Sequence, residues 1–332
     1  MPLIPAVSTL KPFFDGFGTD IYGKEEAGMG ELDRLITEAP KDGSLRYRRA
    51  VAHLTATTYG EVFDDAAAAV KLLAASGAPK AALVDALSLK GTFQHLRGEL
   101  PLAEQTFQEA LALDPNHALT LVRRAIATLE MPTPDKLKKS QDDLHQAATL
   151  EPKNPAVLYH QAQLLMLSQQ FASASDGFKK CIDFGHGGYT PWLQLAATKH
   201  RLGQSNEAMK LFVKVEKLFP NEAMVYIYKG QILMNQGNIA DADAAFAKAN
   251  SSDAANPLPF VNKGMLYMQG DPPGTSASVD KIKEGLDMFE KAIAIEPKCD
   301  VVNHDSALCG EGWGVDGAPK ASAGGRWPIS LA

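Results

Sequence analysis

Apolar residues recur at helical spacing through most of this chain, in segments that alternate with short polar, glycine- or proline-containing breaks. Prolines suited to ending helices stand at Pro115, Pro152, Pro220 and Pro297. A proline cannot donate a helical hydrogen bond, so it stops the helix that precedes it. The gaps between these prolines correspond to one or two periods of about 34 residues plus two insertions. The pattern predicts a repeating pair of helices, with loops at Met131–Asp135 and Gly270–Ser278 as the insertions.

Three sets of positions keep the same period. Small residues recur in the first helix of each pair, at Gly91, Ala125, Ala162, Ala196, Gly230 and Gly264. Small residues recur in the second helix, at Ala103, Ser140, Ala174, Ala208, Ala242 and Gly285, and large ones follow, at Phe107, Leu144, Phe178, Phe212, Phe246 and Phe289. This resembles the tetratricopeptide pattern, in which the small residues of helix A and helix B face each other and the large one fills space toward the next repeat. We therefore predict an all-α, right-handed superhelical tetratricopeptide-repeat solenoid.

The pattern divides the chain into three parts. Residues 44–299 are predicted to hold about seven repeats, the first a degenerate one from Ser44 to Pro79. Residues 1–43 contain an aromatic patch and an acidic stretch, and are predicted to dock on the first repeat. Residues 300–332 are rich in Gly, Ala and Ser, and are predicted to form a low-complexity, disordered tail.

Composition and charge exclude several functions. The formal net charge is −6 with acids and bases interleaved, so there is no basic footprint for nucleic acid. Three cysteines argue against a disulfide framework. No apolar run has the roughly 18–20 residues that span a bilayer, and no secretory signal opens the chain, so we expect a soluble chain as written.

Two segments carry a closer resemblance, which covers about residues 5–302. Pro5-x-x-Ser8 followed by Phe13-Phe14-x-x-Phe17-x-x-Asp20-Ile21 near the start, and Lys217–Pro220, Tyr228–Gln231 and Ala292–Asp300 later, are similar to the mitochondrial outer-membrane import receptor of seventy kilodaltons, the tetratricopeptide subunit of the translocase. The resemblance implies binding of mitochondrial precursor proteins and other translocase subunits on the cytosolic face of the outer membrane. That family also has an N-terminal anchor, chaperone-docking repeats and repeats beyond Asp300. We interpret this sequence as an N-terminally short version with a replaced final segment.

The inner face of such a solenoid is lined by positions 2, 5, 9 and 12 of helix A, and peptides usually bind there. In the later repeats these positions are apolar, with methionines and a few amides, and methionine adapts to varied ligands. Hydrophobic or amphipathic precursor segments would suit this groove. The alternative is that the same residues only pack between repeats. The candidate groove residues are Tyr159, Gln163, Met166, Leu193, Met224, Ile227, Gln231, Met234, Leu258, Val261, Met265 and Met268.

Three other groups of residues do not match the binding sites that they superficially suggest. A clamp for a chaperone's C-terminal tail needs Asn after the small residue of helix A, where this chain has Thr92, Ile126, Gln163, Ala197, Gln231 and Met265. We interpret the glycine-rich loop 184–188 as a helix cap, because it lacks the strand and Gly-Lys-Ser/Thr ending of a phosphate site. Cys299, His304 and Cys309 match no zinc spacing, and Cys181 takes a core position.

We therefore expect a binding protein without cofactor, metal or enzymatic activity. A cytosolic tetratricopeptide co-chaperone or assembly scaffold is the alternative function. An enzyme whose catalytic domain lies elsewhere is a third possibility for a fragment.

Overall fold

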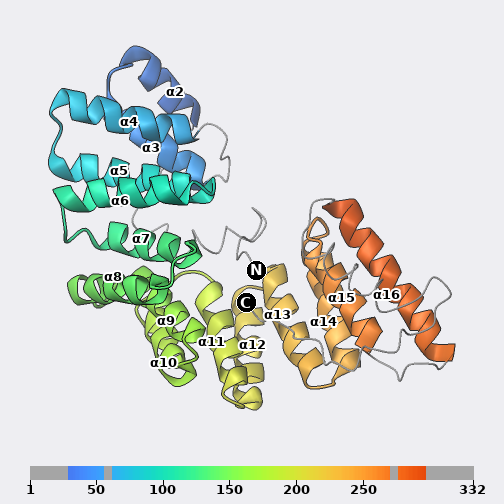
Figure 1. Cartoon of the computed structure of the whole chain (residues 1–332). Coiled ribbons are helices and arrows are strands. Elements are labelled where there is room, and N and C mark those ends of the chain that lie inside the picture. The colour runs from blue at the N-terminus through green and yellow to red at the C-terminus, as the bar shows by residue number, and fades with distance from the viewer. Residues whose placement is uncertain (1–28, 56–61, 270–275, 297–332) are drawn as a thin grey trace. The chain divides into compact units, whose positions relative to one another are not determined.

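The computed structural model describes residues 29–55, 62–269 and 276–296, and within these ranges every regular element is an α-helix (Figure 1). None of the helices in these ranges combines the length and the apolar character that a membrane crossing requires. The predictions for residues 1–28 and for the tail from residue 297 onward lie outside the described residues. The chain divides into two compact units, residues 1–191 and 192–332, which are described separately.

The first unit is built from a leading helix followed by antiparallel helix pairs. Figure 1 shows α5 and α6 lying side by side as one such pair, and α7 with α8 and α9 with α10 repeat the arrangement. Its helices are α2 (Met29–Glu38), α3 (Gly43–Thr55), α4 (Val62–Ser76), α5 (Lys80–Leu96), α6 (Leu100–Leu113), α7 (Ala118–Glu130), α8 (Lys136–Leu150), α9 (Pro155–Leu167) and α10 (Phe171–Asp183).

The second unit continues the same alternation. Its helices are α11 (Thr190–Arg201), which begins at the boundary between the units, α12 (Ser205–Leu218), α13 (Ala223–Asn235), α14 (Ile239–Ser252), α15 (Leu258–Gln269) and α16 (Ser276–Ile295). The predicted insertion at residues 131–135 lies between α7 and α8, as expected. The predicted loop 270–278 was too long, because Ser276 to Ser278 already belong to α16. Serine, alanine and serine are compatible with a first helical turn, which composition alone did not separate from the loop.

The in-phase small and large residues form the core of each pair. All six large residues are at most 1% exposed, so the predicted register is confirmed. The sequence predicted that the large residue of helix B packs only toward the next repeat, and the structure shows a second contact for it. The Phe107 ring packs against Gly91 of its own repeat as well as Ala127 of the next one. The large residue therefore fills space within its repeat and toward the following repeat.

In four of the described repeats the connection from helix A to helix B is a tight turn with one residue in the left-handed region, at Gly98, Gln169, Gly203 and Gly237. Gly203 takes this place between α11 and α12, with a φ of 75°. Its N–H donates to His200 O and the N–H of Gln204 donates to Lys199 O, which closes the carboxyl end of α11. Gln169 takes the same place between α9 and α10 with a φ of 57°, and there the left-handed residue has a side chain.

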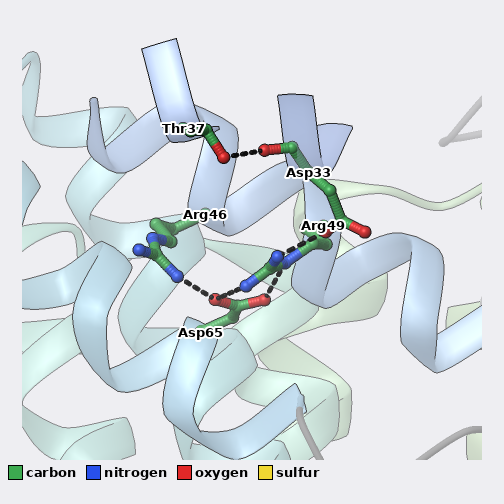
Figure 2. Close-up of polar contacts among 5 residues, drawn as sticks. All are labelled: Asp33, Thr37, Arg46, Arg49 and Asp65. Carbon is green, nitrogen blue, oxygen red and sulfur yellow. Dashed lines mark hydrogen bonds and ion pairs between the residues drawn. The ribbon is translucent and has the colours of Figure 1, made fainter. Parts of the chain in front are cut away.

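The leading helix α2 is attached to the first helix pair by charged side chains, shown in Figure 2, and it also buries apolar residues. Asp65 on α4 is 2% exposed and accepts hydrogen bonds from Arg46 and Arg49 of α3, at 2.6 to 3.0 Å. Arg49 also donates to Asp33 on α2, at 2.5 Å. Leu32 and Ile36 of α2 are also buried. Arg49 therefore links three successive helices through two carboxylates.

Candidate peptide-binding face

The structure separates the predicted groove residues into two groups by burial. Tyr159, Leu193, Ile227, Met234 and Val261 are at most 4% exposed and belong to the core. This differs from the open groove that we expected at Met234, whose side chain packs with Leu233, Phe246 and Leu266. The half-buried residues are Gln163, Met166, Met224, Gln231, Leu258, Met265 and Met268. Packing between repeats, the alternative interpretation, therefore describes the first group.

In the second unit the half-buried residues lie on two successive A helices, α13 and α15. Met224 and Leu258 both pack against the cluster formed by Tyr226, Ile227 and Ala249 and their neighbours. Met265 and Met268 pack against the cluster around Val261 and Phe289. We call the surface formed by Met224, Gln231, Leu258, Met265 and Met268 the methionine–amide face. Each of its methionines rests on the core on one side and keeps part of its surface in solvent.

An amide bridge joins the two helices of this face. Gln231 Nε2 donates to Asn262 Oδ1 at 3.0 Å, and Asn262 Nδ2 donates to Leu258 O at 2.8 Å. Asn262 is 2% exposed, so both of its polar groups are buried and used within the protein. The bridge fixes the spacing of α13 and α15, and with it the spacing of the methionines on either side.

Charged contacts hold α13 and α15 on the B helix that precedes each of them. Lys229 of α13 pairs with Glu216 at 2.7 Å, and Lys263 of α15 pairs with Asp243 at 3.0 Å. Tyr267 Oη also donates to Asp243, at 2.8 Å. Burial alone would lower the pKa of Lys263, but the hydrogen bond and charge of Asp243 outweigh it and raise that pKa. The lysine therefore stays charged and the helix keeps its place.

In the first unit the predicted residues form a closed hydrogen-bonded group on α9. Gln163 Oε1 lies 2.8 Å from Nδ1 of His160, and Gln163 Nε2 donates to Tyr159 Oη at 3.1 Å. The Tyr159 ring also lies against Phe178 and His186, with centroids 5.8 and 5.7 Å apart. Burial, and then the nearby His186, lower the pKa of His160 to about 4 although the Gln163 contact raises it. His160 is therefore neutral at physiological pH, and this group acts as a polar part of the core.

Sequence reasoning missed a row of polar residues within the A helices. His160, Gln194, Tyr228 and Asn262 follow one another at intervals of 34 residues, two positions before the small residue of each helix A. Gln194 and Tyr228 are hydrogen-bonded, as are Gln231 and Asn262. An earlier member, Arg123, donates to Ser88 at 3.0 Å between α7 and α5. The same periodicity that located the small residues could have located this row.

The remaining candidate sites have structural explanations. Thr92, where the clamp interpretation needed Asn, is 3% exposed and donates to Ser88 O at 2.9 Å. Gly185 has a φ of 94° and lies at the carboxyl end of α10, where the N–H of His186 donates to Cys181 O, so the loop is a helix cap. Cys181 is fully buried, and burial raises the pKa of its thiol to about 12.

Within the described ranges no three potential ligands come together as a metal site. Cys299, His304 and Cys309 lie outside these ranges.

Known proteins are similar to this chain both in sequence and in fold. No protein-family model matches the chain. The human mitochondrial import receptor subunit TOM70 is 26% identical over 314 residues, which cover 90% of this chain and 49% of the receptor. The receptor of Saccharomyces cerevisiae is 22% identical over 307 residues, 89% of this chain and 47% of the receptor. The chain thus spans about half the length of the curated relatives it matches.

Solved structures show the same architecture. The crystal structure of yeast Tom70 has a TM-score of 0.68 at 18% identity, and the match covers 92% of this chain and 62% of that one. A tetratricopeptide repeat protein from Parabacteroides merdae has a TM-score of 0.60 at 17% identity, covering 81% of this chain and 98% of that one. The predicted all-α tetratricopeptide solenoid fold is therefore confirmed.

Proposed function

We propose that this chain is a peptide-binding scaffold that captures mitochondrial precursor proteins, because it resembles proteins named mitochondrial import receptor subunits. The observation that carries this proposal is its similarity to import receptor subunits along 90% of its length. Reversible binding without covalent chemistry is the activity we assign to it. Other translocase subunits are its proposed partners, and the cytosolic face of the outer mitochondrial membrane is its proposed location.

The methionine–amide face supports this proposal as the binding surface. Methionine side chains are unbranched and polarisable, so they can adapt to ligands of different sequence. The Gln231–Asn262 bridge holds the two helices at a fixed distance, which reduces the ordering that a ligand would have to impose. A hydrophobic or amphipathic precursor segment lying across α13 and α15 would cover the solvent-facing parts of Met224, Met265 and Met268.

A double substitution tests the face. Met224→Glu with Met265→Glu places two carboxylates on half-buried positions of α13 and α15, while the fully buried Met234 is left unchanged. The probes are two fluorescent peptides of about 20 residues, one Leu/Ala-rich and one amphipathic with Leu and Arg. We expect the dissociation constant for at least one peptide to rise more than tenfold, about 1.4 kcal/mol. The melting temperature should fall by only a few degrees.

Leu102→Glu is the matched control, because Leu102 is 50% exposed and lies on α6 of the first unit, which contributes no residue to this face. It should leave both peptide affinities within about twofold of the unmodified chain. A folded double variant that binds both peptides normally would exclude the methionine–amide face. An unmodified chain that binds neither peptide would contradict the scaffold function itself.

A further inference from the structure

One face of α12 is exposed, basic and apolar at the same time. Lys210, Lys214 and Lys217 recur at intervals of four and three residues, so they lie along one side of the helix. Val213 and Leu218 flank them and are each 53% exposed, which is high for large aliphatic side chains. At 100° per residue the five residues occupy an arc of about 140°. We call this surface the α12 lysine face.

The charge of this region is opposite to that of the chain. Residues 190–218 contain five Lys and Arg residues and two Glu residues, whereas the chain has a formal net charge of −6. Lys210 pairs with Glu207 at 2.9 Å, and both side chains are more than half exposed, so this pair neutralises little of the face. Lys214 lies over the ring of Trp192, with Nζ 4.4 Å from the centroid. The ring holds one lysine in place without cancelling its charge.

Helix α16 of the same unit shows what an exposed helix without such a face looks like. It also has an exposed leucine, Leu286, but its lysines alternate with acids and pair with them. Lys291 lies 2.7 Å from Asp287, and Lys283 lies 3.8 Å from Asp280. That surface is balanced in charge and typical of a solvated helix. The α12 lysine face has a row of cations between two apolar residues, which a solvated surface does not need.

We infer that the α12 lysine face is a second interaction surface, which binds a short acidic helix carrying apolar residues beside its carboxylates. The three lysines extend over about 10 Å of helix axis, the length over which acids at positions i, i+4 and i+7 of a partner helix recur. Val213 and Leu218 would contact apolar residues on the two sides of that acidic row. Because this surface lies on a B helix, it is distinct from the methionine–amide face of the A helices.

The acidic residue at the end of the lysine row and the small apolar area of the face favour a small acidic ligand over an anionic membrane. Glu207 stands one turn before Lys210 on α12, and its side chain is more than half exposed. A flat anionic bilayer would meet this carboxylate together with the lysines, and like charges repel. A short acidic helix can place its row of carboxylates over the three lysines alone. Two aliphatic side chains are also a small apolar area for insertion into lipid.

The experiment uses the full chain with Trp313→Phe and Trp327→Phe, so that Trp192 is the single tryptophan. The probe is an acetylated Glu/Leu/Ala peptide of about 18 residues, five helical turns, with glutamates in one row and leucines on both sides. Its binding is measured by fluorescence anisotropy of a peptide label and by Trp192 emission. A peptide of the same composition in scrambled order, and vesicles containing about 30% phosphatidylserine, are measured alongside.

We expect the ordered peptide to bind, to shift Trp192 emission, and to bind at least fivefold more tightly than the scrambled one. Lys210→Glu, Lys214→Glu and Lys217→Glu together should weaken binding more than tenfold. Lys283→Glu with Lys291→Glu on α16 should change it less than twofold. Circular dichroism should show both variants folded, because the substituted side chains are exposed.

Equal affinity for the scrambled peptide would mean that net charge alone explains the binding, and it would overturn the proposal. Binding to the vesicles in place of the peptide would identify a lipid surface and overturn it as well. Absence of binding to the ordered peptide would also reject it. None of these outcomes affects the proposed precursor-binding function, which depends on α13 and α15.

Discussion

The ring of Phe107 lies so close to Gly91 that a β-carbon built on the glycine would be 2.6 Å from the ring's Cε1. This contact joins α5 and α6, and the ring has no exposed surface into which it could turn. Alanine normally stabilises a helix relative to glycine by about 1 kcal/mol. At Gly91 we expect Gly91→Ala to reduce the free energy of unfolding by about 1–2 kcal/mol, because overpacking outweighs that gain. Urea denaturation measures the difference.

Two further variants check that explanation. A β-carbon added at Gly30 on α2 would meet no atom within 4 Å, so Gly30→Ala should be neutral or stabilise by up to about 1 kcal/mol. Adding Phe107→Leu to Gly91→Ala should give less than additive loss, because the smaller side chain leaves room for the methyl group. Additive losses would show that the ring contact is not the cause.

Gln169 has a left-handed backbone conformation, which glycine adopts at the equivalent position of the next two repeats. Its φ is 57°, and Gly203 and Gly237 hold the same turn position with φ of 75° and 78°. A side chain in the left-handed region costs roughly 1 kcal/mol. We expect Gln169→Gly to raise the free energy of unfolding by about 0.5–1 kcal/mol and Gly203→Gln to lower it by a similar or larger amount. Denaturation midpoints of both variants measure this, and a destabilised Gln169→Gly would contradict it.

The carboxylate of Asp65 should contribute stability in a pH-dependent way. Burial alone would raise the pKa of Asp65, but hydrogen bonds from Arg49 and Arg46 and their charges outweigh it, so that pKa is lowered. A lowered pKa in the folded state means that the contribution is complete above the ordinary value of about 3.9 and is lost as pH falls through the lowered one. At neutral pH we expect Asp65→Asn to cost about 3–5 kcal/mol, because two arginines lose their buried partner.

The difference between the unmodified chain and Asp65→Asn should shrink as the pH falls below about 4. Unfolding followed by circular dichroism across this range measures it. Glu207→Gln is the control, since the Glu207–Lys210 pair is exposed and its loss should have little effect on stability at any pH. A cost of Asp65→Asn that does not change with pH would mean that packing, not charge, explains it.

The buried, neutral His160 should make a second contribution to the pH dependence of stability, at higher pH than that of Asp65. Its folded-state pKa of about 4 lies below the unfolded value of about 6.5, so only the unfolded chain takes up a proton between these values. Stability should therefore fall from about pH 6.5 toward pH 4, by up to roughly 3 kcal/mol. Unfolding measured across this range should show that His160→Gln removes most of the slope, whereas His145→Gln, at an exposed position on α8, leaves it unchanged.

The period of 34 residues was enough to predict the fold, because steric demands repeat with it. A small residue at Gly230 and a ring at Phe246 are required wherever two helices approach closely, and the sequence shows both. The start of α16 was not predictable in the same way. Ser276 to Ser278 can begin a helix or continue a loop, and the choice depends on the neighbouring helices.

The candidate face was predicted only in part, for a physical reason. Periodicity tells which side of a helix a residue is on, but not how much of that side the next repeat covers. Met234 and Met268 occupy equivalent positions of α13 and α15, one period of 34 residues apart, yet Met234 is 4% exposed while Met268 is half-buried. The link from Arg49 to Asp33 and Asp65 was missed because these residues follow no repeat. Only the fold brings them together.

The buried thiol of Cys181 makes the opening of one helix pair directly measurable. The thiolate is the form that attacks thiol reagents, and a pKa of about 12 together with complete burial leaves almost none of it available in the closed structure. Its Sγ also contacts Pro155 O at 3.2 Å, where α9 begins. With Cys299 and Cys309 replaced by serine, a reagent can react only after α9 and α10 separate. The labelling rate would then report how often this pair opens, independently of unfolding of the rest of the chain.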